Sequence, residues 1–595
     1  MTLSKVFLAT TALEEFWDSS YKIIFLTKGC KRYSRQKVWQ NIESETLPSY
    51  YDEKSGRQTY LYLNELSDRL LVVLQKRLNT VHGTDFSLRY WRIVLGMWLI
   101  YYLHMMYDRY SNLKNFIGLY PDFTSLCLNK ECFIIPKDYS SFDKLIFADD
   151  YNLQLYSNIL YWLGYKLPTK KLTIALPDDK TRLFRSRPWY KKILRYNYEL
   201  VCRILANKNQ VLVRNAYFPN GSLLKLVLNT QGAIWPCSYG SPDFPDFPIK
   251  HEARAILGDF TFGDNEFEKM IAALLPFDLP QNAIEGYGFL KKRAEDVFVS
   301  EPQAVMSSVS WGTDNIFQVW AAGLAEKGIP LLGVQHGGGY GLAESQQQED
   351  IELAIVDKYY SWGWKRSGVY ADVKPMPAPK LVTYKTARLK KNNGILFATS
   401  IGPRFLQVFP ESINYWDNTF SDQAIFLSRL SGPVSEQIRI RPHREDLGWD
   451  VRERIKDQFP RLTVEDWSVP FACSLRNCSL YVADNFIRNT TFLEALGNNC
   501  PAIVFTNTAY AVNAINKEVR DLVEELKRQG VVFTDPVKAA DQINAVYDNL
   551  DSWWNEPERQ RAIKNFLERF GRTSADWLQD WTREIQTPRG PDGTK

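Results

Sequence analysis

The chain has 595 residues, which is too long for one hydrophobic core, so two or three domains are expected. Hydrophobic residues make up 45% of it and charged residues 24%, a balance that excludes a largely disordered chain. The net charge of +5 is mild for this length and gives no indication of nucleic-acid binding. The eight cysteines follow no metal or disulfide spacing, which favours reduced thiols in a cytoplasmic protein.

The amino-terminal half combines strands with one long helical stretch. Residues 6–10 predict a first strand and lack the apolar stretch of a signal peptide. Helices are predicted from about Asn64 to Tyr110, and the apolar run within them is too short to span a bilayer. Further on, strands are predicted at residues 172–176, 210–213, 304–308 and 331–334, and a helix at 314–328.

A proline-rich segment predicts a linker at residues 376–392. Strands after it are predicted at residues 395–399, 436–441, 480–484 and 502–505. Strands that alternate with helices in both halves indicate parallel sheets. We therefore predict an α/β protein of GT-B-like architecture, in which two Rossmann-type domains, 1–375 and 393–595, face each other across a cleft. The first carries an added helical segment, and the second ends in helices.

The strand at 331–334 runs into a glycine-rich turn, Gln335-His336-Gly337-Gly338-Gly339-Tyr340-Gly341. Glycine lets the backbone approach a ligand closely, and ligands of α/β proteins bind at the carboxyl ends of strands. Successive N–H groups of such a turn can hold an anion, and His336 could donate to a phosphate or act as an acid or base. The alternative is a tight turn with a structural histidine.

Two motifs of the second half also follow strands. The first ends in Arg441-Pro442-His443-Arg444, whose cations suit phosphate, although a charged surface run would look the same. In the second, Asn489, Thr490 and Thr491 begin a helix whose hydroxyls and amides can bind phosphate. Glu494, one turn later, could reach a ribose hydroxyl or simply complete a helix cap.

Acidic and basic residues near the first domain give weaker indications. Glu14 and Asp18 follow the first strand, where a two-domain transferase often keeps its base, but acids are also favoured at helix starts. The basic and aromatic residues of 182–196 could contact an anionic membrane or form a solvated helix face. No acidic pair resembles a metal clamp, and nothing in the sequence requires a metal or cofactor.

These motifs together resemble a family of transferases encoded in bacterial O-antigen and surface-carbohydrate gene clusters. The resemblance also includes residues 8–17, 82–92 and 359–364, and it extends over nearly the whole chain. The carboxyl-terminal pattern is more loosely similar to Kdo- and sialic-acid-type GT-B transferases, which use CMP-activated sugars.

The resemblance implies a glycosyltransferase of surface polysaccharide (O-antigen, lipopolysaccharide or capsule) biosynthesis. It would transfer a sugar from a nucleotide-sugar donor, such as CMP-Kdo, to a glycan or lipid-linked glycan, on the cytoplasmic side of the plasma membrane, in peripheral contact with it and without binding nucleic acid. Domain 1–375 would bind the acceptor, and domain 393–595 the donor. The implied catalytic residues are His336, Glu14 and Asp18. The implied donor-binding residues are Gln335, Gly337, Gly338, Arg441, His443, Asn489, Thr490, Thr491 and Glu494, and the acceptor-binding residues are His82 and Arg89.

Two alternatives stay open at this point. One is a glycerophosphate-type transferase that uses a CDP-alcohol and acts on a surface polymer. The other is a non-catalytic scaffold of the same pathway.

Overall fold

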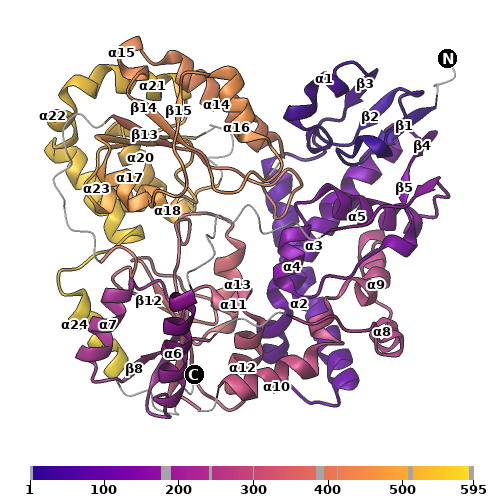
Figure 1. Ribbon diagram of the computed structural model, residues 1–595, viewed down its shortest axis with the longest axis horizontal. Coiled ribbons are helices and arrows are strands. Elements are labelled where there is room, and N and C mark those ends of the chain that lie inside the picture. Colours follow the sequence, from indigo (N-terminus) through magenta and orange to yellow (C-terminus); the bar gives the residue numbers. More distant parts are fainter. Residues whose placement is uncertain are drawn as a thin grey trace.

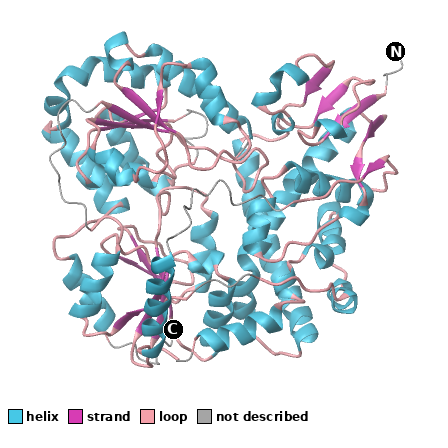
Figure 2. Cartoon of the chain, viewed as in Figure 1, coloured by secondary structure: helices cyan, strands magenta, loops and turns pink. Residues whose placement is uncertain are grey.

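The computed structural model describes residues 5–175, 189–239, 244–298, 301–382, 394–411, 413–506 and 514–587. Within these residues the strands form two six-stranded sheets, one four-stranded sheet and one two-stranded sheet, and all of their strand pairs are parallel. Figure 1 shows the two six-stranded sheets one above the other, with the four-stranded sheet to one side. Helices cover the sheets on their outer faces (Figure 2).

The four-stranded sheet belongs to the amino-terminal part of the chain. Its order is β3-β2-β1-β4, with bounds β1 Val6–Ala9, β2 Ile23–Phe25, β3 Ser44–Thr46 and β4 Phe123–Ser125. Nearby are β5 Cys127–Leu128, β6 Thr169–Lys170, α1 Gln36–Trp39, α4 Tyr139–Leu145 and α5 Asp149–Trp162. The sequence analysis placed the first strand in the same sheet as residues 331–334. The structure corrects this, because among the described strands β1 pairs with β2 and β4, and neither belongs to the sheet of residues 331–334.

Two long helices, α2 Glu53–His82 and α3 Leu88–Leu119, form the predicted helical segment. Ser87 caps α3 by accepting from the Tyr90 N–H. The apolar run of α3 is buried, because α3 packs against both α2 and α12 (Asn315–Glu326). The helix α3 therefore connects the amino-terminal sheet with the first six-stranded sheet. Among the helices that the structure describes, none is long and apolar enough to span a membrane.

The first six-stranded sheet has the order β12-β11-β10-β9-β7-β8. Its strands are β7 Val211–Arg214, β8 Ile234–Pro236, β9 Ala304–Ser307, β10 Leu331–Val334, β11 Lys358–Ser361 and β12 Asp372–Pro375. Its helices include α6 Trp189–Ile204, α7 Asn220–Asn229, α10 Tyr287–Val297 and α13 Gln347–Ile355. The helices α8 His251–Gly258 and α9 Glu266–Asp278 pack instead against α2 and α3. The direction of strand addition reverses between β7 and β9, and ligands of open α/β sheets bind at such a point.

The second six-stranded sheet has the order β15-β14-β13-β16-β17-β18, which is the 3-2-1-4-5-6 order of dinucleotide-binding domains. Its strands are β13 Ile395–Ala398, β14 Ile438–Arg441, β15 Thr463–Val464, β16 Leu480–Ala483, β17 Ala502–Phe505 and β18 Val532–Phe533. Its helices include α14 Ile413–Arg429, α16 Val451–Gln458, α17 Phe471–Arg476, α18 Thr490–Gly497, α20 Arg520–Arg528, α21 Pro536–Val546 and α23 Pro557–Phe570. The prediction of an α/β protein with two Rossmann-like domains is confirmed.

Three details differ from the predicted organisation. Residues 172–175 form no strand, and Leu176 lies outside the described residues. The last helix, α24 Trp577–Gln586, packs on the first six-stranded sheet through Trp581, although it was predicted to end the second domain. Much of the predicted linker lies outside the described residues, but Met376 and Ala378 are buried. The chain thus returns to its first Rossmann-like domain at the carboxyl end.

Candidate active site

A polar cavity of about 360 Å³ lies where the carboxyl ends of the two six-stranded sheets meet. Both Rossmann-like domains contribute to its walls. The residues that line it include Tyr217, His336, Lys380, Glu411, Arg488 and Thr490. The cavity is large enough to hold part of a nucleotide or a sugar ring.

The glycine turn after β10 contacts the start of α18 directly. The Gly338 N–H donates to Thr490 Oγ1 at 2.9 Å, across the junction of the two domains. A Cβ atom on Gly338 would lie 2.9 Å from backbone atoms of Asn489, closer than side chains approach. Only glycine therefore allows this turn to close onto the helix start, and the close approach places the amino end of α18 at the cavity.

His336 lines the cavity with a neutral imidazole ring. Burial and, to a smaller extent, the nearby Lys380 ammonium lower the pKa of His336 to about 4. The Nδ1 atom lies 3.2 Å from the Tyr340 hydroxyl and 3.7 Å from Glu352 Oε1. A neutral imidazole can donate one hydrogen bond and accept another near pH 7.

Two cations line the cavity, and each is paired with a carboxylate. Lys380 lies 2.6 Å from Glu494, the residue predicted to reach a ribose. Arg488 forms an ion pair with Glu411 and also donates to the Ser345 carbonyl at 2.8 Å. An anionic ligand could exchange with Glu411 as the partner of Arg488, since both side chains of this pair line the cavity.

Tyr217 reaches the cavity from the end of β7, next to the reversal in strand order. Its backbone has a φ of 60°, a left-handed conformation that is rare for a tyrosine. Its ring centre lies 5.9 Å from that of His336. Strained backbone of this kind is concentrated at functional sites, so Tyr217 joins the candidate residues.

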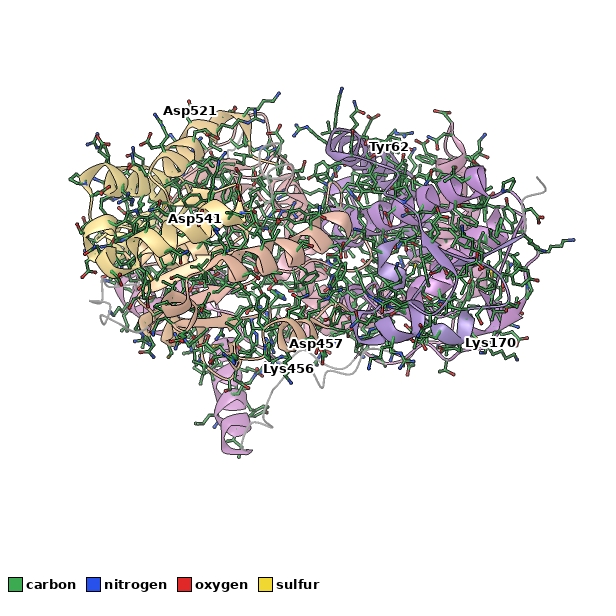
Figure 3. The ribbon with its side chains drawn as sticks, turned by 90° about the horizontal axis from the view of Figure 1, so that it is seen from above. Tyr62, Lys170, Lys456, Asp457, Asp521 and Asp541 are labelled. Atoms are coloured by element: carbon green, nitrogen blue, oxygen red, sulfur yellow. The ribbon has the colours of Figure 1, made fainter. Side chains whose placement is uncertain are left out.

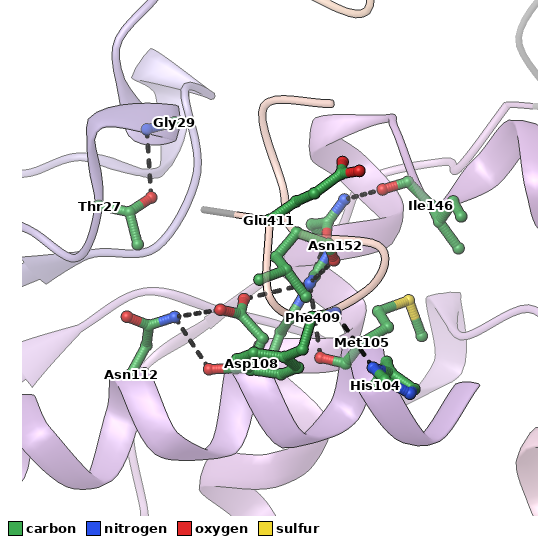
Figure 4. A network of polar contacts seen from close by, with 12 residues as sticks. Thr27, Gly29, His104, Met105, Asp108, Asn112, Ile146, Asn152, Phe409 and Glu411 are labelled. Carbon is green, nitrogen blue, oxygen red and sulfur yellow. Dashed lines mark hydrogen bonds and ion pairs between the residues drawn. The ribbon is translucent and has the colours of Figure 1, made fainter. Parts of the chain in front are cut away.

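The loop 404–411, of which Gln407, Val408 and Glu411 line the cavity, is held by polar side chains of α3 (Figure 4). His104 Nδ1 accepts from the Phe409 N–H at 3.1 Å, and burial lowers the pKa of His104 to about 3. Arg109 donates to the Leu406 carbonyl and, through Nη2, to Asn152 Oδ1 at 2.8 Å. These bonds fix the loop that presents Gln407 and Glu411 to the cavity.

Several predicted donor-binding residues stabilise the site from behind. Gln335 accepts from the Trp362 N–H and the Trp364 indole and donates to the Gly337 carbonyl, each at 2.8 Å. Asn489 caps α18 by accepting from the Phe492 N–H, and Thr491 donates to Asn489 Oδ1 at 2.6 Å. We assign these three residues to positioning. Gly337, Gly338 and Thr490, which were also predicted to bind the donor, line the cavity.

Arg441 and His443 do not line this cavity. Arg441 is buried, and it donates to Glu465 at 3.0 Å, Ser474 at 3.1 Å and the Val469 carbonyl at 2.9 Å. His443 is exposed, and its Nδ1 contacts the backbone of Glu445. The structure gives Arg441 a packing role within the second sheet.

The residues predicted near the acceptor also lie elsewhere. Glu14 pairs with Arg35, and Asp18 accepts from Ser20. Both lie in the amino-terminal unit, which is the four-stranded sheet together with α1, α4 and α5. The ring of His82 lies against that of Tyr287 at a tilt, with ring centres 4.2 Å apart. Arg89 donates to the Ile355 carbonyl at the end of α13 and pairs with Asp357 at 2.9 Å. His82 and Arg89 thus hold helices together.

The cavity contains residues to which the sequence analysis gave no role. Arg488 directly precedes Asn489, the residue that caps α18, and the sequence analysis assigned it no role. Lys380 directly follows Pro379 in the proline-rich segment and lines the cavity. The run Gln346-Gln347-Gln348 also lines it. A cation directly before a helix cap was the signal available for Arg488. Lys380 had none, because its place depends on how the two domains pack.

A family model described as LIC12162 family transferase matches residues 6–585. The chain belongs to this family. It is therefore a transferase, and the predicted enzyme class is confirmed at that level. The search of curated proteins finds no match.

Similarity to solved structures is distant. Trehalose-6-phosphate synthase OtsA has a TM-score of 0.35 and 10% identity, over 64% of this chain and 100% of that chain. Anabaena HepE in complex with UDP-glucose has a TM-score of 0.33 and 11% identity, over 63% of this chain and 97% of that chain. The wall teichoic acid polymerase TagF has a TM-score of 0.31 and 10% identity, over 67% of this chain and 96% of that chain. The fold assignment rests on the strand orders of this chain and not on these likenesses.

Proposed function

We propose that the protein is a glycosyltransferase that moves a sugar from a nucleotide-activated donor to a glycan acceptor in bacterial surface polysaccharide synthesis. The observation that carries this proposal is the polar cavity between the carboxyl ends of two Rossmann-like sheets. The second sheet has the strand order of nucleotide-binding domains. The family, a transferase family, agrees with a group-transfer reaction.

The donor phosphate would lie at the amino end of α18. Backbone N–H groups and the helix dipole stabilise an anion there, and Arg488 and Lys380 add positive charge. As the bond between the sugar and the phosphate oxygen breaks, negative charge grows on the leaving group. Fixed cations and helix amides would stabilise that charge. His336, being neutral, would add a hydrogen bond to the donor.

The test is the thermal stability of the purified protein with CMP, CDP, UDP, GDP and their sugars, including CMP-Kdo. A nucleotide at about 100 times its Kd should add ~2.7 kcal/mol to the free energy of unfolding. Thr490→Val should reduce this response, because Thr490 lines the cavity at the amino end of α18. Thr463→Val is the matched control, since Thr463 is exposed on β15 and does not line the cavity.

The pattern of responses separates the alternatives. Stabilisation by CMP compounds alone would support a CMP-ulosonic donor, whereas turnover of CDP-glycerol would favour the glycerophosphate-type transferase. The absence of any nucleotide response would refute the donor proposal and leave the scaffold.

Peripheral contact with an anionic membrane is a second part of the proposal, and α6 supports it. In Figure 3 this helix projects from one side of the molecule. Ile193, Leu194, Leu200, Val201 and Ile204 lie on one side of α6 and are 43–68% exposed, whereas Cys202 on the opposite side is buried. An amphipathic helix with its apolar side turned outward is typical of membrane-surface binding.

The positive charge of this part of the chain favours an anionic lipid surface over an uncharged apolar partner. Residues 180–198 contain seven lysines and arginines and no acid, although residues 180–188 lie outside the described part of the chain. Anionic headgroups attract such a segment. Sedimentation with phosphatidylglycerol vesicles should capture the protein, and phosphatidylcholine vesicles should capture less. The double variant Leu194→Gln/Ile204→Gln should lose binding, whereas Leu61→Gln, an exposed leucine on α2, should keep it. Binding that survives the double variant would refute this role of α6.

A further inference from the structure

A second cavity, of about 630 Å³, lies between the amino-terminal unit and the second Rossmann-like domain. From the amino-terminal unit, Asp143 and Lys144 of α4 line it, and from the second domain Arg444 and Glu445 do so. Its walls offer both carboxylates and cations. A polyhydroxylated ligand suits such walls, because each hydroxyl group both donates and accepts hydrogen bonds.

Asp143 lies between this cavity and the cavity of His336. Its Oδ1 accepts from Gln407 Nε2 at 3.1 Å, and Gln407 lines the His336 cavity. Tyr101 also lines the His336 cavity, and the charge of Asp143 contributes to the raised pKa of Tyr101. Asp143 therefore lines the larger cavity and is connected to the His336 cavity through Gln407.

The surroundings of Asp143 favour proton transfer near neutral pH. Burial and, to a smaller extent, the Glu445 carboxylate of the second domain raise the pKa of Asp143 to about 6. The Gln407 amide and the Lys144 ammonium act in the opposite direction. The phenols of Tyr101 and Tyr139, whose rings lie 6.2 Å apart, face it from α3 and α4. A general base works best when its pKa lies near the working pH.

We infer that Asp143 is the general base of the transfer and that the larger cavity holds the end of an acceptor glycan. The acceptor hydroxyl would give its proton to the Asp143 carboxylate, and its oxygen would bond to the anomeric carbon. The bond from that carbon to the donor phosphate oxygen breaks, and its electron pair leaves with the nucleotide. A single displacement of this kind inverts the anomeric configuration. The inference rests on the proposed function.

The experiment measures nucleotide release against pH, using the donor that stabilises the wild type and methyl glycosides of glucose, galactose and mannose as acceptor probes. We expect kcat of the wild type to fall as pH decreases through about 6, because the base must be deprotonated. His336 cannot produce this limb, because its pKa lies near 4. Asp143→Asn should lower kcat about 10²–10⁴-fold and keep the nucleotide-dependent thermal shift.

Two further variants complete the design. Asp122→Asn is the matched control, because Asp122 is exposed and lines neither cavity, so its kcat should match the wild type. Glu445→Gln should move the acid limb to lower pH, since it removes the carboxylate that raises the pKa of Asp143. An active Asp143→Asn, or an acid limb unmoved in Glu445→Gln, would overturn the inference. Failure of the proposed function would instead appear in the wild type, as a lack of any nucleotide response.

Discussion

The carboxyl ends of β10 and β14 look alike in the sequence but differ in the structure. Each strand is followed by a short segment with a histidine, and each segment was predicted to bind the donor. After β10 the backbone turns through glycines and leaves His336 on a cavity. After β14 the Arg441 guanidinium is enclosed by Glu465, Ser474 and the ring of Trp467, 4.3 Å away.

The ion pairs of the second domain show what decides between these outcomes. The side chains of Arg441 and Glu465 are only 3% and 10% exposed, whereas those of Arg488 and Glu411 are 26% and 17% exposed. A ligand can reach a partly exposed ion pair and replace one of its partners, but it cannot reach a buried ion pair. A cation at the end of a strand is therefore a binding residue only where its partner can be exchanged.

His336 gives the largest expected effect. We expect His336→Asn to lower kcat about 10²–10³-fold, because the shorter amide withdraws the imidazole N–H from the donor group on which negative charge develops. Nucleotide-dependent stabilisation should persist, since Thr490 and Arg488 remain. Steady-state kinetics and thermal shift on the same preparation measure both. Full activity in this variant would remove the β10 turn from the site.

Arg441 and Arg488 give the next contrast. Arg441→Met should lower the free energy of unfolding by about 3–5 kcal/mol, because it leaves the Glu465 carboxylate buried without its partner. Its response to nucleotide should remain. Arg488→Met should instead weaken nucleotide binding about tenfold or more, the effect of losing a charged hydrogen bond.

Calorimetric titration and denaturant unfolding of both variants measure this contrast. Glu411→Gln sharpens it, because this change frees Arg488 and should tighten nucleotide binding. Loss of nucleotide binding in Arg441→Met, with the fold intact, would contradict the packing role of Arg441.

The sequence predicted the parts of the site that depend on neighbouring residues. Glycine after an apolar strand and the hydroxyl residues before an apolar helix both form their structures locally, so Gly338 and Thr490 were found. Lys380 and Gln407 could not be found, because they reach the cavity only through the packing of α3 and α24 against distant parts of the chain. The extra sheet around β1 was missed because strand pairing is not visible in a single sequence.

His104 offers a pH-dependent test of the bond that holds the loop 404–411. Its pKa of about 3 lies below the ordinary value of 6.5, so between these values the unfolded chain binds a proton that the folded chain does not. Stability is therefore complete above pH 6.5 and is lost as pH falls towards 3. His104→Gln keeps an acceptor for the Phe409 N–H but does not titrate.

The stability advantage of the wild type over His104→Gln should therefore shrink by about 2 kcal/mol between pH 7 and pH 5. Thermal unfolding at several pH values measures it. The exposed His251→Gln serves as the control. A constant difference between the wild type and His104→Gln would mean that His104 takes up its proton in the folded state.

Glu14 gives the smallest expected effect and tests the predicted base near β1. Its carboxylate accepts two bonds from Arg35 at 2.6 Å, which lower the pKa of Glu14, and it does not line the His336 cavity. We expect Glu14→Gln to change kcat less than about twofold, because exposed ion pairs contribute little. The measurement is the assay used for His336→Asn. A hundredfold loss would place the base at the amino-terminal sheet and would require the two Rossmann-like domains to share their site with it.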